Sequence, residues 1–247
     1  MPTTQQMLSY MRKGISTYNL ISDGDKIAVG VSGGKDSLAL LKLLAEYKRF
    51  SPEKFDLIAV TVDLCFGGKD GDYSAISSLC EEYGIKYIVE KTQIAEVVFD
   101  IRKETNPCAL CSKMRKGALH NVAKREGCNK VALGHHADDL IDTLMLSLFY
   151  EGRLSTFSPI SYLDKIDLTM IRPLIMTKEA NVVAYSKDLP VVESKCPANK
   201  NTKREYVKDI IKKIAEDVPN IRDMIFTAIT HPERYNLFDK FIKENKD

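Results

Sequence analysis

Residues 30–37, Gly-Val-Ser-Gly-Gly-Lys-Asp-Ser, have the composition of a loop that binds phosphate. Glycines let the backbone turn sharply and approach a ligand, and the N–H groups at the start of a following helix attract an anion. Ser32, Lys35 and Ser37 add hydrogen-bond donors and one positive charge. Asp36 stands where a Walker loop needs Ser or Thr, and the glycine spacing differs from the dinucleotide fingerprint. Without a ligand, the segment would be a glycine-rich turn whose helix is capped by Asp36 or Ser37.

A second segment, residues 134–143, reads Gly-His-His-Ala-Asp-Asp-Leu-Ile-Asp-Thr and follows an expected strand. Spacings of three and four residues place His135, Asp138, Asp139 and Asp142 near one face of a helix. Carboxylates at a helix start favour the positive end of its dipole, so charge capping is one interpretation. The other is a Mg²⁺ ion that accompanies a nucleotide, because carboxylate oxygens are good ligands for hard cations.

Three cysteines form a third pattern, a Cys-x-x-Cys pair at Cys108 and Cys111 and a distant Cys196 that precedes Pro197. A redox dithiol of the thioredoxin type is expected at the first helix of a sheet, where the glycine-rich loop already lies. Structural zinc usually takes four protein ligands, and no second pair is evident in the sequence. An iron–sulfur cluster accepts three cysteines, and the iron left without a protein ligand could bind sulfide.

The other three cysteines need separate interpretations. Cys80 and Cys128 lie in apolar patterns and are expected to pack in the core. Cys65 follows the expected strand that ends at Asp63, so both residues lie at the end of a strand where ligands bind in open α/β sheets.

Composition bounds the class of protein. The chain has 247 residues, of which 44% are hydrophobic and 28% charged, and this balance excludes disordered and collagen-like chains. The formal net charge of +2 neither favours nor excludes a nucleic-acid partner. Apolar runs are too short for a membrane span, and the first ten residues do not have the layout of a signal peptide. We therefore expect a cytoplasmic protein without a membrane partner.

The elements that must position these motifs alternate between strand and helix patterns. An apolar stripe from Met7 to Tyr18 predicts a leading helix. Strands are expected at 26–31, 57–63, 87–90, 131–134 and 169–172, and helices near 38–44, 72–83, 112–125 and 137–150. This alternation predicts an α/β fold with a Rossmann-like, doubly wound parallel sheet. The pattern after about residue 190 is helical only, so we expect a catalytic domain over 1–190 and a helical C-terminal extension over 191–247 that carries Cys196.

Basic residues gather around the cysteine segments. Seven Lys or Arg residues lie between Arg102 and Arg125 against one Glu, and a second basic cluster extends from Lys195 to Lys213. If the cysteines meet at one site, the two clusters form a cationic rim that could contact RNA. A solvated helix face is the alternative interpretation of the outer lysines.

Ser32-Gly-Gly-Lys-Asp-Ser37 resembles the signature of the PP-loop ATP pyrophosphatases, which share a Rossmann-like fold. That resemblance implies cleavage of ATP between its α and β phosphates and transfer of AMP to a carbonyl oxygen of the substrate. Residues 134–143 resemble the Gly-His-x-x-Asp-Asp motif of the same group, with Asp142 where a Glu is usual. The three cysteines, with Arg115 and Arg172-Pro-Leu174, make the chain similar to the tRNA 2-thiocytidine synthetase family, whose members bind a [4Fe-4S] cluster.

The resemblance implies an ATP-dependent enzyme that puts sulfur on C2 of a pyrimidine in tRNA, with cytidine as the expected base. Its expected cofactors are ATP, Mg²⁺ and the cluster, its sulfur source is sulfide or a persulfide, and a homodimer is allowed. The expected cluster ligands are Cys108, Cys111 and Cys196. The expected nucleotide-binding residues are Ser32, Gly33, Gly34, Lys35, Asp36, Ser37, Asp63, Gly134 and His135. The candidate catalytic residues are Lys35, Asp138 and Asp139, with Lys113 and Arg115 as stabilisers of developing negative charge.

Two alternatives remain open on the sequence. Another PP-loop enzyme, such as a lysidine- or amide-forming ligase, would use the cysteines for zinc. A regulator that binds nucleotide and metal without turnover would release no pyrophosphate.

Overall fold

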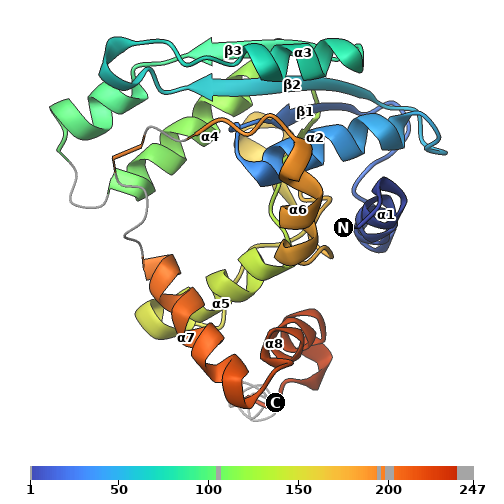
Figure 1. Cartoon of the computed structure of the whole chain (residues 1–247), viewed down its shortest axis with the longest axis vertical. Helices are drawn as coiled ribbons and strands as arrows, with labels where there is room; N and C mark the ends of the chain where they lie inside the picture. Colours follow the sequence, from blue (N-terminus) through green and yellow to red (C-terminus); the bar gives the residue numbers. More distant parts are fainter. Residues whose placement is uncertain (1, 104–106, 194–195, 198–202, 238–247) are drawn as a thin grey trace, which may run out of the picture. The chain divides into compact units, whose positions relative to one another are not determined.

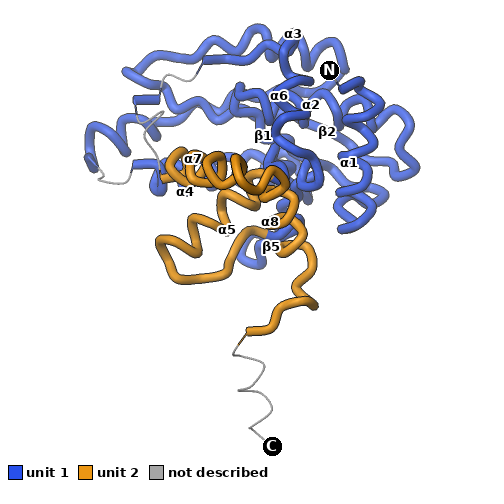
Figure 2. The backbone as a smooth tube through the Cα atoms, turned by 60° about the horizontal axis from the view of Figure 1, so that its bottom comes forward, with its two compact units in different colours: residues 1–137, 158–202 blue, residues 138–157, 203–247 orange. Residues whose placement is uncertain are grey.

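The computed structural model describes residues 2–103, 107–193, 196–197 and 203–237. The chain divides into two compact units, which Figure 2 shows in different colours. Unit 1 comprises residues 1–137 and 158–202, and unit 2 comprises residues 138–157 and 203–247. The division differs from the boundary expected at residue 190, because Cys196 stays with the sheet and the helix after residue 137 joins the C-terminal helices.

Unit 1 is built on one six-stranded sheet with the order β3-β2-β1-β4-β6-β5. Figure 1 shows β3, β2 and β1 side by side. The four pairings among β3, β2, β1, β4 and β6 are parallel, and β5 is antiparallel to β6. The strands are β1 (Lys26–Gly30), β2 (Asp56–Asp63), β3 (Lys86–Lys91), β4 (Lys130–Ala132), β5 (Ile160–Leu163) and β6 (Leu168–Ile171). The helices are α1 (Thr4–Tyr18), α2 (Lys35–Lys48), α3 (Ser74–Glu82), α4 (Pro107–Arg125) and α6 (Glu179–Tyr185), and α5 (Ala137–Glu151) begins at the unit's last residue before the break. The α/β class, the parallel core and the C-terminal helices expected from the sequence are confirmed.

Alternating side chains of the strands supply two cores. Ile27 and Val29 of β1 pack in the cluster that includes buried residues of α1, α2 and α6. Ala28, between them, packs with Leu119 and Val122 of α4 in a second cluster. Because successive side chains of a strand point to opposite faces, α4 covers the face of the sheet opposite to α2.

The structure differs from the sequence-based expectations at three elements. Helix α4 begins at Pro107, so Cys108 and Cys111 lie within its first turns instead of before it. The edge strand β5 and the seven-residue helix α6 were not expected. Both are short, and β5 is only partly buried, so neither leaves a long apolar pattern in the sequence.

A buried carboxylate connects the turn after α1 to β4. Asp25 accepts hydrogen bonds from the Ser22 N–H at 2.6 Å and from Asn129 Nδ2 at 2.7 Å. It also lies 2.7 Å from Nζ of Lys130, which donates to the Leu20 carbonyl oxygen. These contacts satisfy a charged group that is only 5% exposed.

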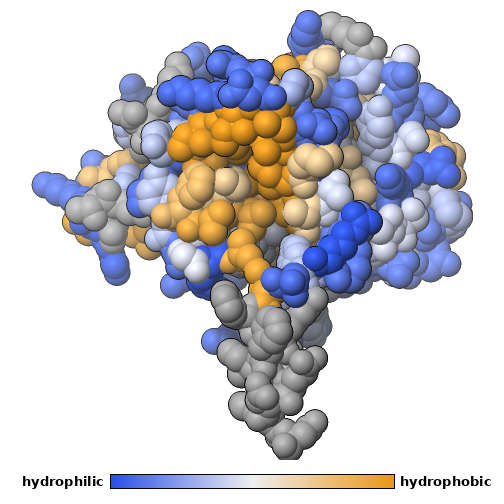
Figure 3. Space-filling view, turned by 90° about the horizontal axis from the view of Figure 1, so that it is seen from below, coloured by the Kyte–Doolittle hydropathy of each residue, from blue (hydrophilic) through white to orange (hydrophobic). Residues whose placement is uncertain are grey.

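The described part of unit 2 contains the α-helices α5, α7 (Lys203–Asp217) and α8 (Ile221–Thr230), and a short 3-10 helix at Pro232–Arg234. Their apolar side chains form a separate cluster around Ile141, Val207 and Ile211. Large apolar side chains of α5 and α8 stay exposed, among them Leu148, Phe149 and Met224, and Figure 3 shows a broad apolar area on the face seen from below. Among the described residues, no helix combines the length and the hydropathy needed to cross a bilayer.

We predict that Asp25→Ala lowers the free energy of unfolding by ~3–5 kcal/mol, because it leaves the buried Lys130 ammonium without its counter-charge. Urea unfolding followed by circular dichroism measures the loss. Asp56→Ala is the matched control, since it removes an exposed ion pair to Lys48 and should cost less than ~1 kcal/mol. Equal losses in the two variants would contradict the role given to Asp25.

Candidate active site

The glycine-rich loop between β1 and α2 is held by its own hydroxyl groups. The Ser32 N–H donates to Ser37 Oγ at 3.1 Å, and Ser37 Oγ donates to the Gly34 carbonyl oxygen at 2.9 Å. Gly33 has φ +83°, a conformation that side chains disfavour. Gly34 is the N-cap of α2 and offers no side chain to its first turn. The loop therefore leads directly into a helix start of the kind that binds anions.

Lys35 lies between two carboxylates. Its Nζ is 3.0 Å from Asp36 and 3.2 Å from Glu179 of α6. Burial alone would lower the pKa of the Lys35 ammonium, but Asp36 and Glu179 raise it above its ordinary value, so the side chain is charged at neutral pH. Ser186 donates from Oγ to the Lys35 carbonyl oxygen at 3.2 Å. Glu179 was not expected at the site, because only a long-range contact brings it beside Lys35.

The residues after β4 lie against the start of α2. A Cβ on Gly134 would come within 2.8 Å of the Asp36 carbonyl oxygen, so only glycine allows this approach. Nε2 of the buried His136 lies 3.6 Å from Asp36 Oδ1. Strand order reverses between β1 and β4, and ligands of open α/β sheets bind at such a switch point.

A pocket of about 160 Å³ connects the loop to the cysteines. Its lining includes Ser32, Asp63, Cys111, Arg115 and Cys196. The structure thus brings together a residue of the phosphate loop, two residues of α4 and the distant cysteine, all within unit 1.

The side chains of Cys108 and Cys196 lie near enough to Cys111 for the ionised sulfurs to repel one another. Burial raises the pKa of the Cys111 thiol above its ordinary value, Arg115 opposes this increase, and Cys196 and Cys108 add to it. All six cysteines are thiols. A thiol beside two others and a guanidinium fits a cationic cluster that thiolates ligate, because a metal would remove the repulsion between the sulfurs.

The segment before Cys196 is held against the phosphate loop. The Val192 N–H donates to the Gly33 carbonyl oxygen at 2.9 Å. A Cβ on Gly33 would lie 2.9 Å from Cβ of Val192, so this contact also requires glycine. Lys195, within the second basic cluster, lies outside the described residues.

Asp63 orders the loop after β2. Its carboxylate accepts the Cys65 N–H at 3.0 Å and the Gly71 N–H at 2.8 Å. Ligand atoms of Asp63, Cys65 and Asp70 lie within 4.8 Å of one another, but Asp70 also pairs with Lys91. Hydrogen bonds and an ion pair account for these carboxylates, and Asp63 reaches the candidate site through the pocket that it lines.

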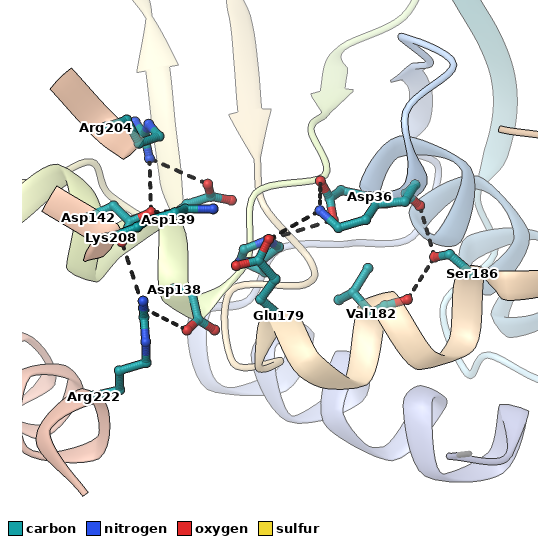
Figure 4. A network of polar contacts seen from close by, with 12 residues as sticks. Asp36, Asp138, Asp139, Asp142, Glu179, Val182, Ser186, Arg204, Lys208 and Arg222 are labelled. Atoms are coloured by element: carbon teal, nitrogen blue, oxygen red, sulfur yellow. Dashed lines mark hydrogen bonds and ion pairs between the residues drawn. The ribbon is translucent and has the colours of Figure 1, made fainter. Parts of the chain in front are cut away.

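The carboxylates of the second motif face cations within unit 2 (Figure 4). Asp138 lies 2.9 Å from Arg222, and Asp139 lies 3.5 Å from Arg204. Asp142 is completely buried and lies within 4 Å of Arg204, Lys208 and Arg222. Burial raises the pKa of Asp142 to about 6, although the three cations oppose it. Arg222 was not expected at the site, because it is 80 or more residues away along the chain from its partners.

Lys113 does not share the pocket of Cys111 and Arg115. It lines a different depression with Lys116 and His120. A helix turns by about 100° per residue, so positions 111 and 113 point to nearly opposite sides of α4.

The chain is similar to proteins of known function over nearly all of its length. The PP-loop domain family matches residues 4–215. The tRNA-cytidine(32) 2-sulfurtransferase of Syntrophotalea carbinolica is 38% identical over 237 residues, which are 94% of this chain and 91% of that protein. The enzyme of the same name from Pelobacter propionicus is 36% identical over 245 residues, 97% of this chain and 90% of that protein.

Among solved structures, the U34-tRNA thiolase NcsA from Methanococcus maripaludis with its [4Fe-4S] cluster matches with a TM-score of 0.71 and 26% identity. The match covers 94% of this chain and 81% of that one.

We predict that Asp142 makes unit 2 less stable as the pH rises from about 4 to 6. The unfolded chain loses the proton near the ordinary pKa of 3.8 and the folded chain near 6, so ionisation costs the folded state up to ~3 kcal/mol. Urea unfolding at several pH values should show this loss in the wild type and a smaller one in Asp142→Asn. Asp217→Asn, at the exposed end of α7, controls for net charge. An unchanged pH dependence in Asp142→Asn would refute the assignment.

Proposed function

Because this chain belongs to the PP-loop domain family and to the tRNA-cytidine(32) 2-sulfurtransferases, we propose that it uses ATP to replace the C2 oxygen of a cytidine in tRNA with sulfur. ATP activates the oxygen by forming an adenylate and releasing pyrophosphate. Sulfur then takes the place of the oxygen, which leaves with AMP. The reaction suits a PP-loop fold, since the loop is an anion site for the phosphates.

The observation that carries the proposal is the pocket shared by Ser32, Cys111, Arg115 and Cys196. It supports activation by nucleotide and transfer of sulfur at one place, within reach of the same base. Activation by nucleotide alone would need only the loop residue, and transfer of sulfur alone would need only the cysteines and Arg115.

We assign the nucleotide to the loop of unit 1. Ser32, Gly33, Gly34 and Ser37 would donate hydrogen bonds to the phosphates, and Lys35 would exchange its contacts with Asp36 and Glu179 for phosphate oxygens. Gly134 and His135 would approach the nucleotide from the end of β4. Asp36 and Asp63 would act by orienting Lys35 and the loop after β2.

We assign Mg²⁺ to Asp138 and Asp139, whose carboxylates suit a hard cation. Arg222 and Arg204 hold these side chains within unit 2, so the ion would share them with the guanidinium groups or displace those groups. The assignment of Mg²⁺ thus rests on the chemistry of the two carboxylates, which contact arginines in this structure.

Cys108, Cys111 and Cys196 would hold the [4Fe-4S] cluster, which when bound supplies an iron that carries the incoming sulfur. The Arg115 guanidinium beside Cys111 favours the thiolate form needed for ligation. It also faces the pocket where negative charge develops on the base during transfer. Lys113, on the other side of α4, is not assigned to this step.

The proposal also covers the sulfur donor, the cellular location and the oligomeric state. We propose sulfide or a persulfide as the sulfur donor, and the cytoplasm, where ATP and tRNA meet, as the location. We also propose a homodimer, which the exposed apolar side chains of α5 and α8 support.

We predict that Cys108→Ala, Cys111→Ala and Cys196→Ala each lower tRNA thiolation by at least ~100-fold, since each removes a cluster ligand. Binding of ATP, measured by calorimetry, should persist, because the phosphate loop is unchanged. Anaerobically reconstituted proteins would be assayed for iron, sulfide and 2-thiocytidine. Cys65→Ala is the matched control and should keep its iron and activity. Thiolation by Cys108→Ala, or zinc as the metal bound by the wild type, would reject the cluster and favour the lysidine- or amide-forming alternative, whereas absent pyrophosphate release would favour the regulator.

For the homodimer, light scattering after size exclusion should give twice the chain mass. Phe149→Asp should give the mass of one chain, because it places a charge among exposed apolar side chains. Phe50→Asp changes an equally exposed phenylalanine of unit 1 and should leave the mass unchanged. A monomeric wild type would refute this part of the proposal alone.

A further inference from the structure

A groove of about 670 Å³ lies on the side of α4 away from the cysteine pocket. Lys113, Lys116 and His120 of α4 form one wall. Tyr162 of β5, with Asp164 and Lys165 of the turn that follows, forms the other. All of these residues belong to unit 1, and none of them lines the pocket of Cys111 and Cys196.

The groove carries positive charge that the described part of the chain does not neutralise. Lys113, Lys116 and Lys165 are exposed, and none forms an ion pair with another described residue. Asp164 is the one carboxylate among the residues that line the groove. Lys124, further along α4, differs from these lysines because it forms an ion pair with Asp167. Three ammonium groups against one carboxylate attract a polyanion.

An exposed aromatic ring stands at the same groove. The Tyr162 side chain is 59% exposed, and its hydroxyl donates to Asp167 Oδ1 at 2.9 Å. That hydrogen bond restrains the ring while its surface stays accessible. Lysines that track phosphates beside an aromatic surface on which a base stacks are the combination used to bind single-stranded nucleic acid.

The position of the groove on α4 relates it to the sulfur site. Cys108, Cys111 and Arg115 lie along one side of the helix, and Lys113 and Lys116 lie along another. A helix with its side chains is about 10–12 Å across. A strand of RNA bound in the groove would therefore pass within a few nucleotides of the pocket.

We propose that this groove binds the tRNA backbone beside the target nucleotide, with Lys113, Lys116 and Lys165 on phosphates and Tyr162 against an unpaired base. The assignment rests on the proposed function, and it names the surface through which the substrate is held. The groove accounts for affinity, and the cysteine pocket accounts for chemistry.

The test removes charge from the groove and, in a control, from two exposed lysines that do not line it. The variant combines Lys116→Gln with Lys165→Gln, and the control combines Lys13→Gln of α1 with Lys54→Gln before β2, both exposed. We expect the groove variant to weaken tRNA binding about 10-fold at 0.1 M salt and to reduce the slope of log K against log salt by ~1.5–2. The control should change neither. The iron content of the reconstituted groove variant should equal that of the wild type, because no cysteine is changed.

Tyr162 gives a second test that does not depend on charge. Tyr162→Ala should weaken tRNA binding at least ~5-fold, whereas Tyr162→Phe, which keeps the ring, should bind nearly as well as the wild type. Equal losses in both variants would assign the effect to the hydrogen bond with Asp167 and overturn the stacking role.

The possible failures are distinguishable. Wild-type affinity and salt dependence in the groove variant would overturn the groove while leaving thiolation by the wild type intact. A wild type that binds tRNA but forms no 2-thiocytidine would overturn the proposed function, and the binding comparison would still decide the groove. A wild type that does not bind tRNA would overturn both.

Discussion

The hydrogen bond from the Val192 N–H to the Gly33 carbonyl oxygen is the contact on which the site depends. It joins two segments nearly 160 residues apart and delivers Cys196 to the pocket that α4 and the phosphate loop already form. Gly33 is required twice, for its positive φ and for the space that Val192 occupies. Gly33 of the glycine-rich loop is therefore also the attachment point of the segment that leads toward Cys196, and one backbone contact joins the two parts of the proposed site.

Charge is distributed differently in the two units. In unit 1, Lys35 is the cation of the loop, and the carboxylates of Asp36 and Glu179 raise its pKa and keep it charged. In unit 2, arginine and lysine side chains of α7 and α8 surround the carboxylates of α5. Asp142 is completely buried, and the loss of solvent around its carboxylate raises its pKa. Asp138, which is also buried, and the partly buried Asp139 keep shorter contacts, with Arg222 and Arg204 respectively.

Local patterns predicted most of the fold. The apolar runs of β1 and β2 and the periodicity of α1 and α2 are properties of neighbouring residues, and they survive in the structure. The glycine-rich loop was predictable because its function requires residue types at fixed spacing. Glu179 and Arg222 were not predictable, since each acquires its role from a partner brought near by the fold. The division of the chain was also hidden, because the apolar face of α5 matches helices far downstream and not the sheet that precedes it. Lys113 and Arg115 were both candidate stabilisers of negative charge, but they line different depressions on α4.

Helix α4 presents two unrelated surfaces from one continuous stretch of residues. Because the two sets of positions interleave along the helix, substitutions can change one set and leave the other in place. The side chains of the proposed RNA-binding groove could then change among descendants of this protein while the cysteines stay in place. An insertion or deletion of one residue within the helix would have the opposite effect, since a rotation of about 100° displaces both surfaces at once. Lineages should consequently tolerate exchange of side chains here far better than any change of length.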